Sequence, residues 1–282
     1  MIDVYRPRAL VIIVATAILG LAVWLVVDRL LDQRKKQRYD ANLGKIISLI
    51  ERPAEAEPAA VFDMVRRFIH GHSRHAVDAE FRRVHGDRNL IATGIIAHAT
   101  GQSSEPVHLE CSTRSNLMSA VLRKLGYQTR IVYVFDTDGD DGEKLRSHTF
   151  VDVLNPSTGK WESHDPDYDF FWRAVAAGDR VSVPETAEEL SKIEPCDENR
   201  CGWDLVSDEG QAAATIHSLI DIVSTVDKSA DRRITRFTSR ANPNKVFTFY
   251  DRRGTFCEIM AKLCTNIVGA ATPGGSRSSP MQ

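Results

Sequence analysis

The chain has 282 residues, with 36 Lys and Arg against 38 Asp and Glu, so its formal net charge is -2 at neutral pH. Apolar residues make up 43% and charged residues 26%, which is usual for a globular protein and excludes a disordered, collagen-like or disulfide-dense chain. Because basic residues are not in excess, the charge balance gives no indication of nucleic acid as a partner. The length predicts one or two domains, at roughly 150 residues for each.

The first predicted element is an apolar segment, residues 9–27, which reads ALVIIVATAILGLAVWLVV and contains no charged residue. A helix of about 20 apolar residues crosses the roughly 30 Å hydrocarbon core of a bilayer. Tyr5 and Trp24 lie near its two ends, where aromatic side chains favour the membrane interface. The alternative is a cleaved signal peptide, but the run is long for one and no small-x-small cleavage site follows. We therefore predict a single-pass protein that contacts the membrane through residues 9–27.

The side of the membrane on which the rest of the chain lies is indicated by two conflicting signals. Arg6 and Arg8 precede the apolar segment, but a larger group of basic residues follows it: Arg29, Arg34, Lys35, Lys36 and Arg38. The positive-inside rule thus favours a cytoplasmic C-terminal domain. The cysteines outside the candidate site favour an oxidising compartment. We expect an extracytoplasmic, periplasmic domain. Because it is anchored in the membrane, another membrane protein is a possible partner.

Proline and glycine divide the remainder of the chain. A charged helical segment follows the span and ends in a linker at Pro53 and Pro58. The last residues, TPGGSRSSPMQ, have the composition of a disordered tail. We predict four parts: residues 1–28 as an N-terminal tail and transmembrane helix, 29–57 as a helical stalk and linker, 58–271 as a globular domain with additional C-terminal helices, and 272–282 as a disordered tail.

Two polar segments are candidates for metal binding. His70, His72 and His75 lie in HGHSRH, where neither a cysteine nor a pair of carboxylates stands at ligand spacing, so we favour a solvated loop. The acidic stretch DTDGDDGEKLRS follows Phe135 and has alternating aspartates, but it does not complete an EF-hand pattern. We interpret it as a solvated loop or a flap over the site, with a calcium site as the alternative. We assign no metal and no cofactor.

Cys111 lies where a helix is predicted to begin. Apolar residues follow it at helical spacing: Leu117, Met118, Val121, Leu122 and Leu125. Gly126 is placed to end this helix, and Ser112 or Thr113 to cap its start. The N-terminus of a helix presents unpaired N–H groups and partial positive charge, which favour a thiolate and can hold an oxyanion.

A base and a carboxylate follow in the chain. His148 opens HTFVDVLN, which reads as a strand, and the turn NPSTGK joins it to WESHDPDYDFFW, which contains Asp165. The two strands are predicted to form a hairpin. A thiol, an imidazole and a carboxylate that orients the imidazole make a Cys-His-Asp triad. We predict Cys111 as the nucleophile, His148 as its base and Asp165 as the orienting carboxylate. For the side chain that completes the oxyanion site, Gln102 and His108 are candidates.

The order of these motifs resembles the core of the transglutaminase-like superfamily: Cys at a helix start, a leucine-rich helix, Gly126 and Arg130, a strand, His at a strand start, and Trp161 shortly before Asp165 and Pro166. The resemblance covers residues 107–172. One departure is Glu110, where the family often has Gly, because a carboxylate there opposes the thiolate. The resemblance implies an α+β, papain-like fold in which the helix that bears the cysteine packs on an antiparallel sheet. With the apolar N-terminus, it indicates a bacterial, membrane-anchored member.

The resemblance also implies a function. We expect a membrane-anchored cysteine hydrolase or transamidase that acts on an amide or peptide bond, in a peptide or a protein, through a Cys acyl-enzyme. One alternative is a non-catalytic scaffold or binding module of the same fold in a membrane or cell-envelope assembly, because fold does not determine function. Another is an acyltransferase that uses the triad with a small thioester donor. No nucleic-acid partner is expected.

The C-terminal third is predicted to be mainly helical. Helices are expected at residues 186–193, 212–226 and 255–268, with a short strand at Val246–Tyr250. Cys196 and Cys201, in CDENRC, are placed to form a local disulfide, with a zinc site as the alternative. Cys257 and Cys264 would lie about 10.5 Å apart along one helix, too far for a disulfide.

Overall fold

A six-stranded antiparallel sheet, in the order β7-β6-β5-β4-β3-β8, forms the centre of the structure. The structure is a computed structural model that describes residues 6–135, 147–220, 222–226, 234–238 and 246–250, the last three segments by their backbone. The strands are β3 (Thr129–Phe135), β4 (Ser147–Leu154), β5 (Trp161–Asp165), β6 (Phe170–Ala174), β7 (Ile193–Cys196) and β8 (Ile222–Val226). Helices pack on this sheet, which confirms the predicted α+β class.

The hairpin predicted between His148 and Asp165 is present as β4 and β5. Leu154 pairs with Trp161, and Asn155 makes the turn: its side-chain oxygen accepts from the Ser157 amide at 2.9 Å, and its carbonyl accepts from Gly159 at 2.8 Å. Gly159 has φ 70°, a conformation that glycine adopts without the strain of a Cβ. The turn residues thus set the register that brings the ends of β4 and β5 together.

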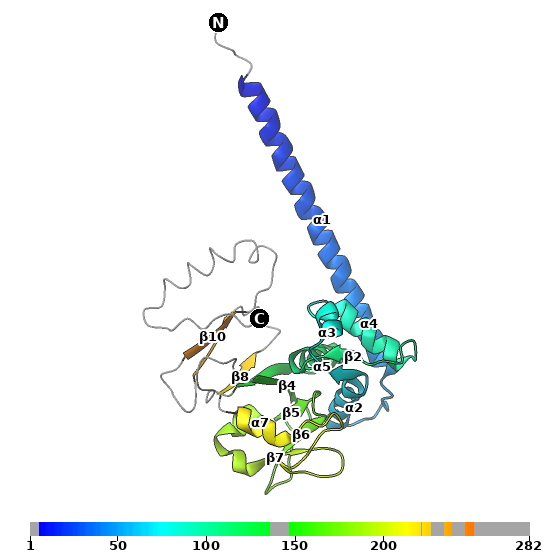
Figure 1. Cartoon of the computed structure of the whole chain (residues 1–282), viewed down its shortest axis with the longest axis vertical. Helices are drawn as coiled ribbons and strands as arrows, with labels where there is room; N and C mark the ends of the chain where they lie inside the picture. The colour runs from blue at the N-terminus through cyan, green and yellow to red at the C-terminus, as the bar shows by residue number, and fades with distance from the viewer. Residues whose placement is uncertain (1–5, 136–146, 221, 227–233, 239–245, 251–282) are drawn as a thin grey trace.

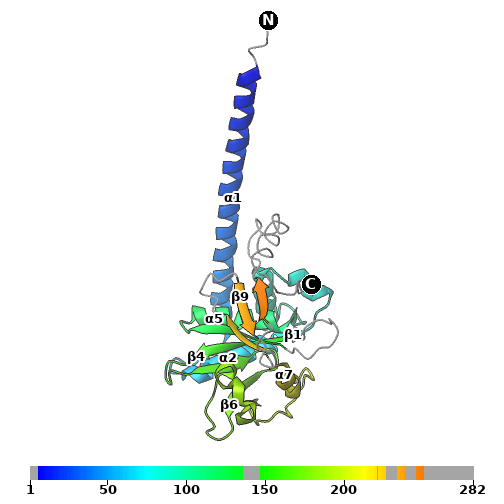
Figure 2. The same cartoon turned by 90° about the vertical axis from the view of Figure 1, so that its left-hand side faces the viewer.

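Two hydrophobic cores lie on the two faces of the sheet. Successive residues of a strand point to opposite faces. Accordingly Ile131 and Val151 belong to one core, and their neighbours Val132 and Phe150 to the other. The first core is filled from the N-terminal helices, and the second from β6, β7 and the segments after them. Figures 1 and 2 both show α5 on the side of the sheet nearer α1, with α7 farther from α1 than α5 is.

The N-terminal layer contains five helices and a short pair of strands. They are α1 (Arg6–Leu49), α2 (Pro58–Gly71), β1 (Ser73–His75), α3 (Ala79–Val84), α4 (Arg88–Ala99), β2 (Val107–Leu109) and α5 (Cys111–Lys124). Aspartates cap two of the helices: Asp78 accepts from the Phe81 amide at 3.0 Å, and Asp87 from the Asn89 amide at 2.8 Å. Gly126 follows α5 with φ 96° and ends it as predicted. β1 and β2 run parallel.

The segment predicted as a stalk is the C-terminal half of α1, one continuous helix that leaves the globular part as a long rod (Figure 1). Its last turns are part of the domain, because Leu43 and Ile46 are buried in the first core together with Ile50. In the part of the chain that the structure describes, no helix is both long and apolar enough to cross a membrane. The side chains of residues 6–15 lie outside that part, so the span at 9–27 stays a prediction.

The C-terminal third is less helical than predicted: the strand at Val246–Tyr250 is confirmed, but β7, β8 and the strand at Ile234–Thr238 were not predicted, and the helix predicted at 186–193 is mainly a 3-10 helix. The helix predicted at 212–226 is wrong in its second half: α7 (Ala213–Leu219) ends early, and β8 pairs antiparallel with β3. The β-branched residues of IVSTV favour a strand, and pairing with the exposed edge of β3 decides the outcome. The other elements of this region are α6 (Val183–Thr186), the 3-10 helix η2 (Ala187–Lys192), and the antiparallel pair β9 (Ile234–Thr238) and β10 (Val246–Tyr250).

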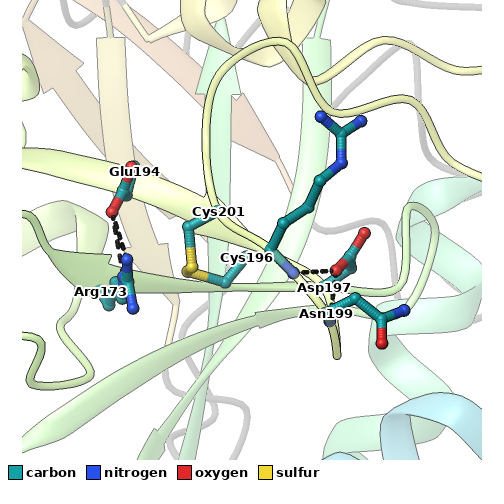
Figure 3. The surroundings of a disulfide bond; sticks show 7 residues. Arg173, Glu194, Cys196, Asp197, Asn199 and Cys201 are labelled. Atoms are coloured by element: carbon teal, nitrogen blue, oxygen red, sulfur yellow. Dashed lines mark hydrogen bonds and ion pairs between the residues drawn. A yellow bond between two sulfur atoms is a disulfide. The ribbon is translucent and has the colours of Figure 1, made fainter.

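Cys196 and Cys201 form a disulfide, as predicted, which excludes them as zinc ligands (Figure 3). It closes a turn in which the Asp197 side chain accepts from the Asn199 amide at 2.7 Å. An ion pair between Arg173 and Glu194 joins β6 to β7 nearby. The other C-terminal predictions, the helix at 255–268 with Cys257 and Cys264 and the tail at 272–282, lie outside the described residues, as does the acidic loop at 136–146.

Candidate active site

Cys111 is the first residue of α5 and a free, half-buried cysteine. The predicted cap by Ser112 or Thr113 is wrong: Glu110 occupies the N-cap, and its carbonyl accepts the first bonds of the helix, from Thr113 and Arg114 at 3.0 Å each. The Glu110 carboxylate accepts from the Ser112 hydroxyl at 2.7 Å. The amides of Cys111 and Ser112 precede these first helical bonds, so they are the donors nearest to an oxyanion formed at the sulfur.

His148 and Asp165 form a buried pair. The imidazole Nε2 lies 2.6 Å from Asp165 Oδ2, and both side chains are almost fully removed from solvent. The second carboxylate oxygen of Asp165 accepts from the amides of Asp167 at 2.8 Å and Tyr168 at 3.3 Å. The carboxylate is therefore fixed by the turn after β5, and it fixes the ring of His148 in turn.

The pKa of His148 also depends on Cys111. Burial lowers the pKa of His148, but the Asp165 carboxylate and a hydrogen bond with the Cys111 side chain raise it, and the net result lies well above its usual value. The structure thus brings Cys111, His148 and Asp165 together. An imidazolium held between a sulfur and a carboxylate is the charge arrangement that stabilises a thiolate.

Aromatic rings enclose the imidazole. Tyr168 meets His148 edge to face with the ring centroids 5.0 Å apart, and Phe150 lies at 6.2 Å. Burial, together with the charges of Asp165 and Asp167, raises the pKa of Tyr168 far above its usual value, so its hydroxyl stays neutral. The rings keep water from the His148–Asp165 pair, which strengthens its electrostatic interaction.

A second His-Asp pair lies beside the first, and sequence reasoning missed it. His75 Nδ1 is 2.9 Å from the buried carboxylate of Asp167, and this hydrogen bond outweighs burial and raises the pKa of His75. Arg114 lies 3.2 Å from the same carboxylate and pairs with Glu209 at 2.9 Å. One signal was available: Arg114 stands on the apolar stripe of α5, and a buried guanidinium requires an anionic partner.

The turn that carries Asp165 is fixed from a further direction. Asp169 adopts φ 60°, and its carboxylate accepts from Arg66 Nε at 2.7 Å. Arg66 is buried and also donates to Asp63 at 2.7 Å. The turn between β5 and β6 is thus held by two buried arginines, Arg66 and Arg114. This makes the position of the Asp165 carboxylate independent of a substrate.

The remaining predicted candidates lie elsewhere. Gln102 is exposed in the turn after α4, and His108 Nδ1 contacts Asp78 at 2.8 Å. Among the described residues, neither side chain forms a hydrogen bond or an ion pair with Cys111 or His148. His164 next to Asp165 is buried with a lowered pKa, mainly because of burial.

The part of the chain that the structure describes contains no group of three His, Cys, Asp or Glu side chains able to hold a metal ion; the acidic loop of the calcium alternative lies outside that part. The histidines of HGHSRH have other partners. His70 Nε2 contacts Asp208 at 2.6 Å, and His72 Nδ1 lies 2.9 Å from Nδ1 of His98.

A cleft of about 500 Å³ adjoins the second His-Asp pair. Its lining comprises Ser73, Arg74, His75, Pro106, Asp208, Glu209 and Gln211. Strand β1 lines the cleft and pairs with β2. In this pairing His75 is opposite Leu109, which is two residues before Cys111 in the sequence.

Comparisons with known proteins leave the family open. No protein-family model matches the chain, and no curated protein does. Among solved structures, a chain in the crystal structure of Rad4-Rad23 bound to a 6-4 photoproduct UV lesion aligns with 14% identity and a TM-score of 0.29. The alignment covers 69% of this chain and 41% of that chain. A likeness at this level carries no argument about function.

Proposed function

We propose that the protein is a cysteine hydrolase or acyl transferase with a transglutaminase-like, papain-like core, acting on an amide or peptide bond through an acyl-enzyme on Cys111. The observation that carries the proposal is the contact of Cys111, at the start of α5, with a buried imidazole that Asp165 binds at 2.6 Å. A scaffold needs neither a buried ion pair beside a half-buried thiol nor the desolvation that such a pair requires.

The arrangement supports the following reaction. The thiolate of Cys111 attacks the carbonyl carbon, and the amides at the start of α5 bind the resulting oxyanion. The imidazolium of His148 gives its proton to the leaving amine as the C–N bond breaks, which leaves a thioester on Cys111. The neutral imidazole then takes a proton from water, or from an acceptor amine, as this attacks the thioester; the C–S bond breaks, the acyl product leaves, and the Cys111 thiolate beside the imidazolium of His148 is restored. Asp165 holds the ring in one orientation throughout.

The proposed acyl-enzyme can be tested without knowing the substrate. p-Nitrophenyl acetate transfers an acetyl group to an activated thiol and releases a coloured phenolate. We expect a burst of phenolate, acetylation that maps to the peptide containing Cys111, and loss of both in Cys111→Ser and His148→Gln. Hydroxylamine should accelerate removal of the acetyl group. Acetylation that is equal in wild type and His148→Gln would contradict the proposal and favour a non-catalytic module.

We also propose that residues 9–27 anchor the domain to a membrane and that the domain is extracytoplasmic. Disulfides persist in oxidising compartments, and the Cys196–Cys201 bond supports this side of the membrane against the count of basic residues. Leu19, Val23 and Trp24 on α1 are exposed, and in the membrane they would face lipid.

A further inference from the structure

Tyr168 lies beside the candidate triad, between two residues that buried arginines hold in place. The carbonyl of Asp167, just before it, accepts from Arg114 at 2.9 Å. The carboxylate of Asp169, just after it, accepts from Arg66 at 2.7 Å. The backbone on both sides of Tyr168 is therefore fixed, and the turn presents the phenol ring from one position before a substrate arrives.

The phenol ring reaches the site from the face of the sheet that carries the second core. Tyr168 and Phe150 both belong to that core, and His148 stands two residues before Phe150 on β4, so its side chain points to the same face. There Tyr168 meets the imidazole of His148 edge to face, with the ring centroids 5.0 Å apart. The apolar residues of α5 lie in the first core. The amides at the start of α5 and the Tyr168 ring therefore approach the reacting centre from opposite faces of the sheet.

The hydroxyl of Tyr168 has no hydrogen-bond partner in the part of the chain that the structure describes. The buried side-chain atoms without a partner in that part do not include it, so the hydroxyl is open to solvent although the residue is only 7% exposed. Burial and the charges of Asp165, Asp167 and Cys111 raise the pKa of Tyr168. The hydroxyl thus stays neutral within the electrostatic reach of the sulfur, and it is free to bind a substrate group.

The two sides of the reacting centre receive different parts of an amide. Nε2 of His148 binds Asp165, which leaves Nδ1 for Cys111 and for the proton that the leaving nitrogen takes. The carbonyl oxygen turns to the amides of α5, so the leaving nitrogen turns to His148, the side on which Tyr168 packs. That nitrogen carries one N–H, and its lone pair must point at Nδ1 as the C–N bond breaks. An acceptor for the N–H on this side would set the direction of the lone pair.

We propose that Tyr168 is a further catalytic residue: its hydroxyl oxygen accepts the N–H of the leaving nitrogen and turns the lone pair of that nitrogen toward Nδ1 of His148. The inference rests on the proposed function, and it makes an amide, which has this N–H, a better substrate than an ester. As the C–N bond breaks, its electron pair passes to the nitrogen, which takes the proton from Nδ1, while the hydroxyl keeps its own proton. In the reverse direction an attacking primary amine gives one proton to Nδ1 and keeps an N–H for Tyr168.

The test follows an acetyl group from Cys111 to two matched acceptors. The full-length chain in detergent is acetylated with p-nitrophenyl acetate in the presence of glycinamide or glycolamide, which differ by an amino group against a hydroxyl group. Both acceptors give one proton to His148, but only the attacking amine keeps an N–H for Tyr168. The rates at which the two acetylated products form are measured by mass spectrometry, and Cys111→Ser gives the background of direct reaction with the ester. We expect Tyr168→Phe to lower the ratio of the glycinamide rate to the glycolamide rate about five- to tenfold, the effect of one hydrogen bond.

Two further variants separate the hydroxyl from the ring. Tyr127→Phe is the matched control and should keep the wild-type ratio, because its ring packs on Phe62 in the first core. Tyr168→Leu also removes the ring from His148, so it should slow both acceptors and lower the ratio by the same factor as Tyr168→Phe. A wild-type ratio in both Tyr168 variants, or no transfer to glycinamide in wild type, would overturn the inference, and the proposed function would stand as long as Cys111 is acetylated. If Cys111 of the wild type is not acetylated, the proposed function fails and the inference fails with it.

Discussion

The charge of His148 depends on two residues, and each contribution can be removed separately. Asp165 and Cys111 raise its pKa, while burial lowers it. In Asp165→Asn the carboxylate charge is lost and burial remains, so the pKa of His148 should fall toward or below its usual value of about 6.5. NMR titration of the His148 ring would show this shift. A titration that is the same in wild type and variant would contradict the buried ion pair.

The same shift makes stability depend on pH. Because the folded-state pKa of His148 is raised, its protonated form stabilises the fold below the unfolded pKa of about 6.5, and this stabilisation is lost as pH rises through the folded value. Denaturant unfolding should therefore show a free energy of unfolding that falls with rising pH in this window in wild type. The fall should be smaller in His148→Gln. Equal slopes in the two proteins would mean that His148 is not protonated in the folded state.

Arg114 is the residue whose loss should affect stability most directly at the site. It is buried, and it neutralises Asp167 and Glu209. Arg114→Met fills similar volume but leaves Glu209 without its cation and Asp167 with His75 alone, so we expect a loss of about 3–5 kcal/mol in the free energy of unfolding. Arg82→Met is the matched control, on an exposed position, and should change it by less than about 0.5 kcal/mol. A loss for Arg114→Met no larger than that of the control would contradict the role assigned to this network.

The sequence was informative about residues with a local context. Cys111 precedes a helical apolar pattern that Gly126 ends, and this pattern places it at a helix start. His75 and Asp167 have no such context, because their pairing depends on the parallel β1–β2 ladder and on the turn after β5. The N-cap was assigned to Ser112 or Thr113 from residue preference alone, whereas the bonds accepted by the Glu110 carbonyl determine where the helix begins.

At the scale of elements, α1 has an exposed apolar part and a C-terminal end that is buried in the first core, and truncation can test the two separately. Removal of residues 1–38 takes away the exposed apolar part and keeps Leu43, Ile46 and Ile50 in the core. We expect that protein to be soluble and folded. Removal of residues 1–50 deletes these three side chains, each worth about 1.5–3 kcal/mol on burial, which approaches the whole stability of a domain. Circular dichroism melts of the two proteins decide the point: equally stable proteins would show that the end of α1 is a free stalk.

Elements with a strong local pattern were predicted well, and one that depends on pairing was not. The helix of Cys111 with Gly126 at its end, and the hairpin turn at Asn155, follow from spacing and turn chemistry. The segment at 212–226 carries a helical apolar pattern in its sequence, yet β8 forms from its last residues. The edge of β3 is available for pairing only in the folded sheet, and no local pattern contains that information.

At the scale of the whole molecule, the count of basic residues favours a cytoplasmic domain and the disulfide favours an extracytoplasmic one, and the two positions can be told apart by experiment. If the domain is extracytoplasmic, alkaline phosphatase fused after the domain should be active, and the Cys196–Cys201 bond should be found in a digest made without reductant. The intact chain should sediment with membranes and resist extraction at high salt. Free thiols at both positions in freshly lysed cells, together with an inactive fusion, would place the domain in the cytoplasm.

The proposed function depends on whether His148 activates Cys111, and the rate of alkylation by iodoacetamide as a function of pH tests this most directly. Modification is read at the peptide that contains Cys111, so that other cysteines do not contribute. In wild type we expect rapid alkylation at about pH 6, where an ordinary thiol is almost wholly protonated, and in His148→Gln we expect the slow reaction of an ordinary thiol at that pH. A wild-type profile that matches a free cysteine and does not change in His148→Gln would contradict the triad.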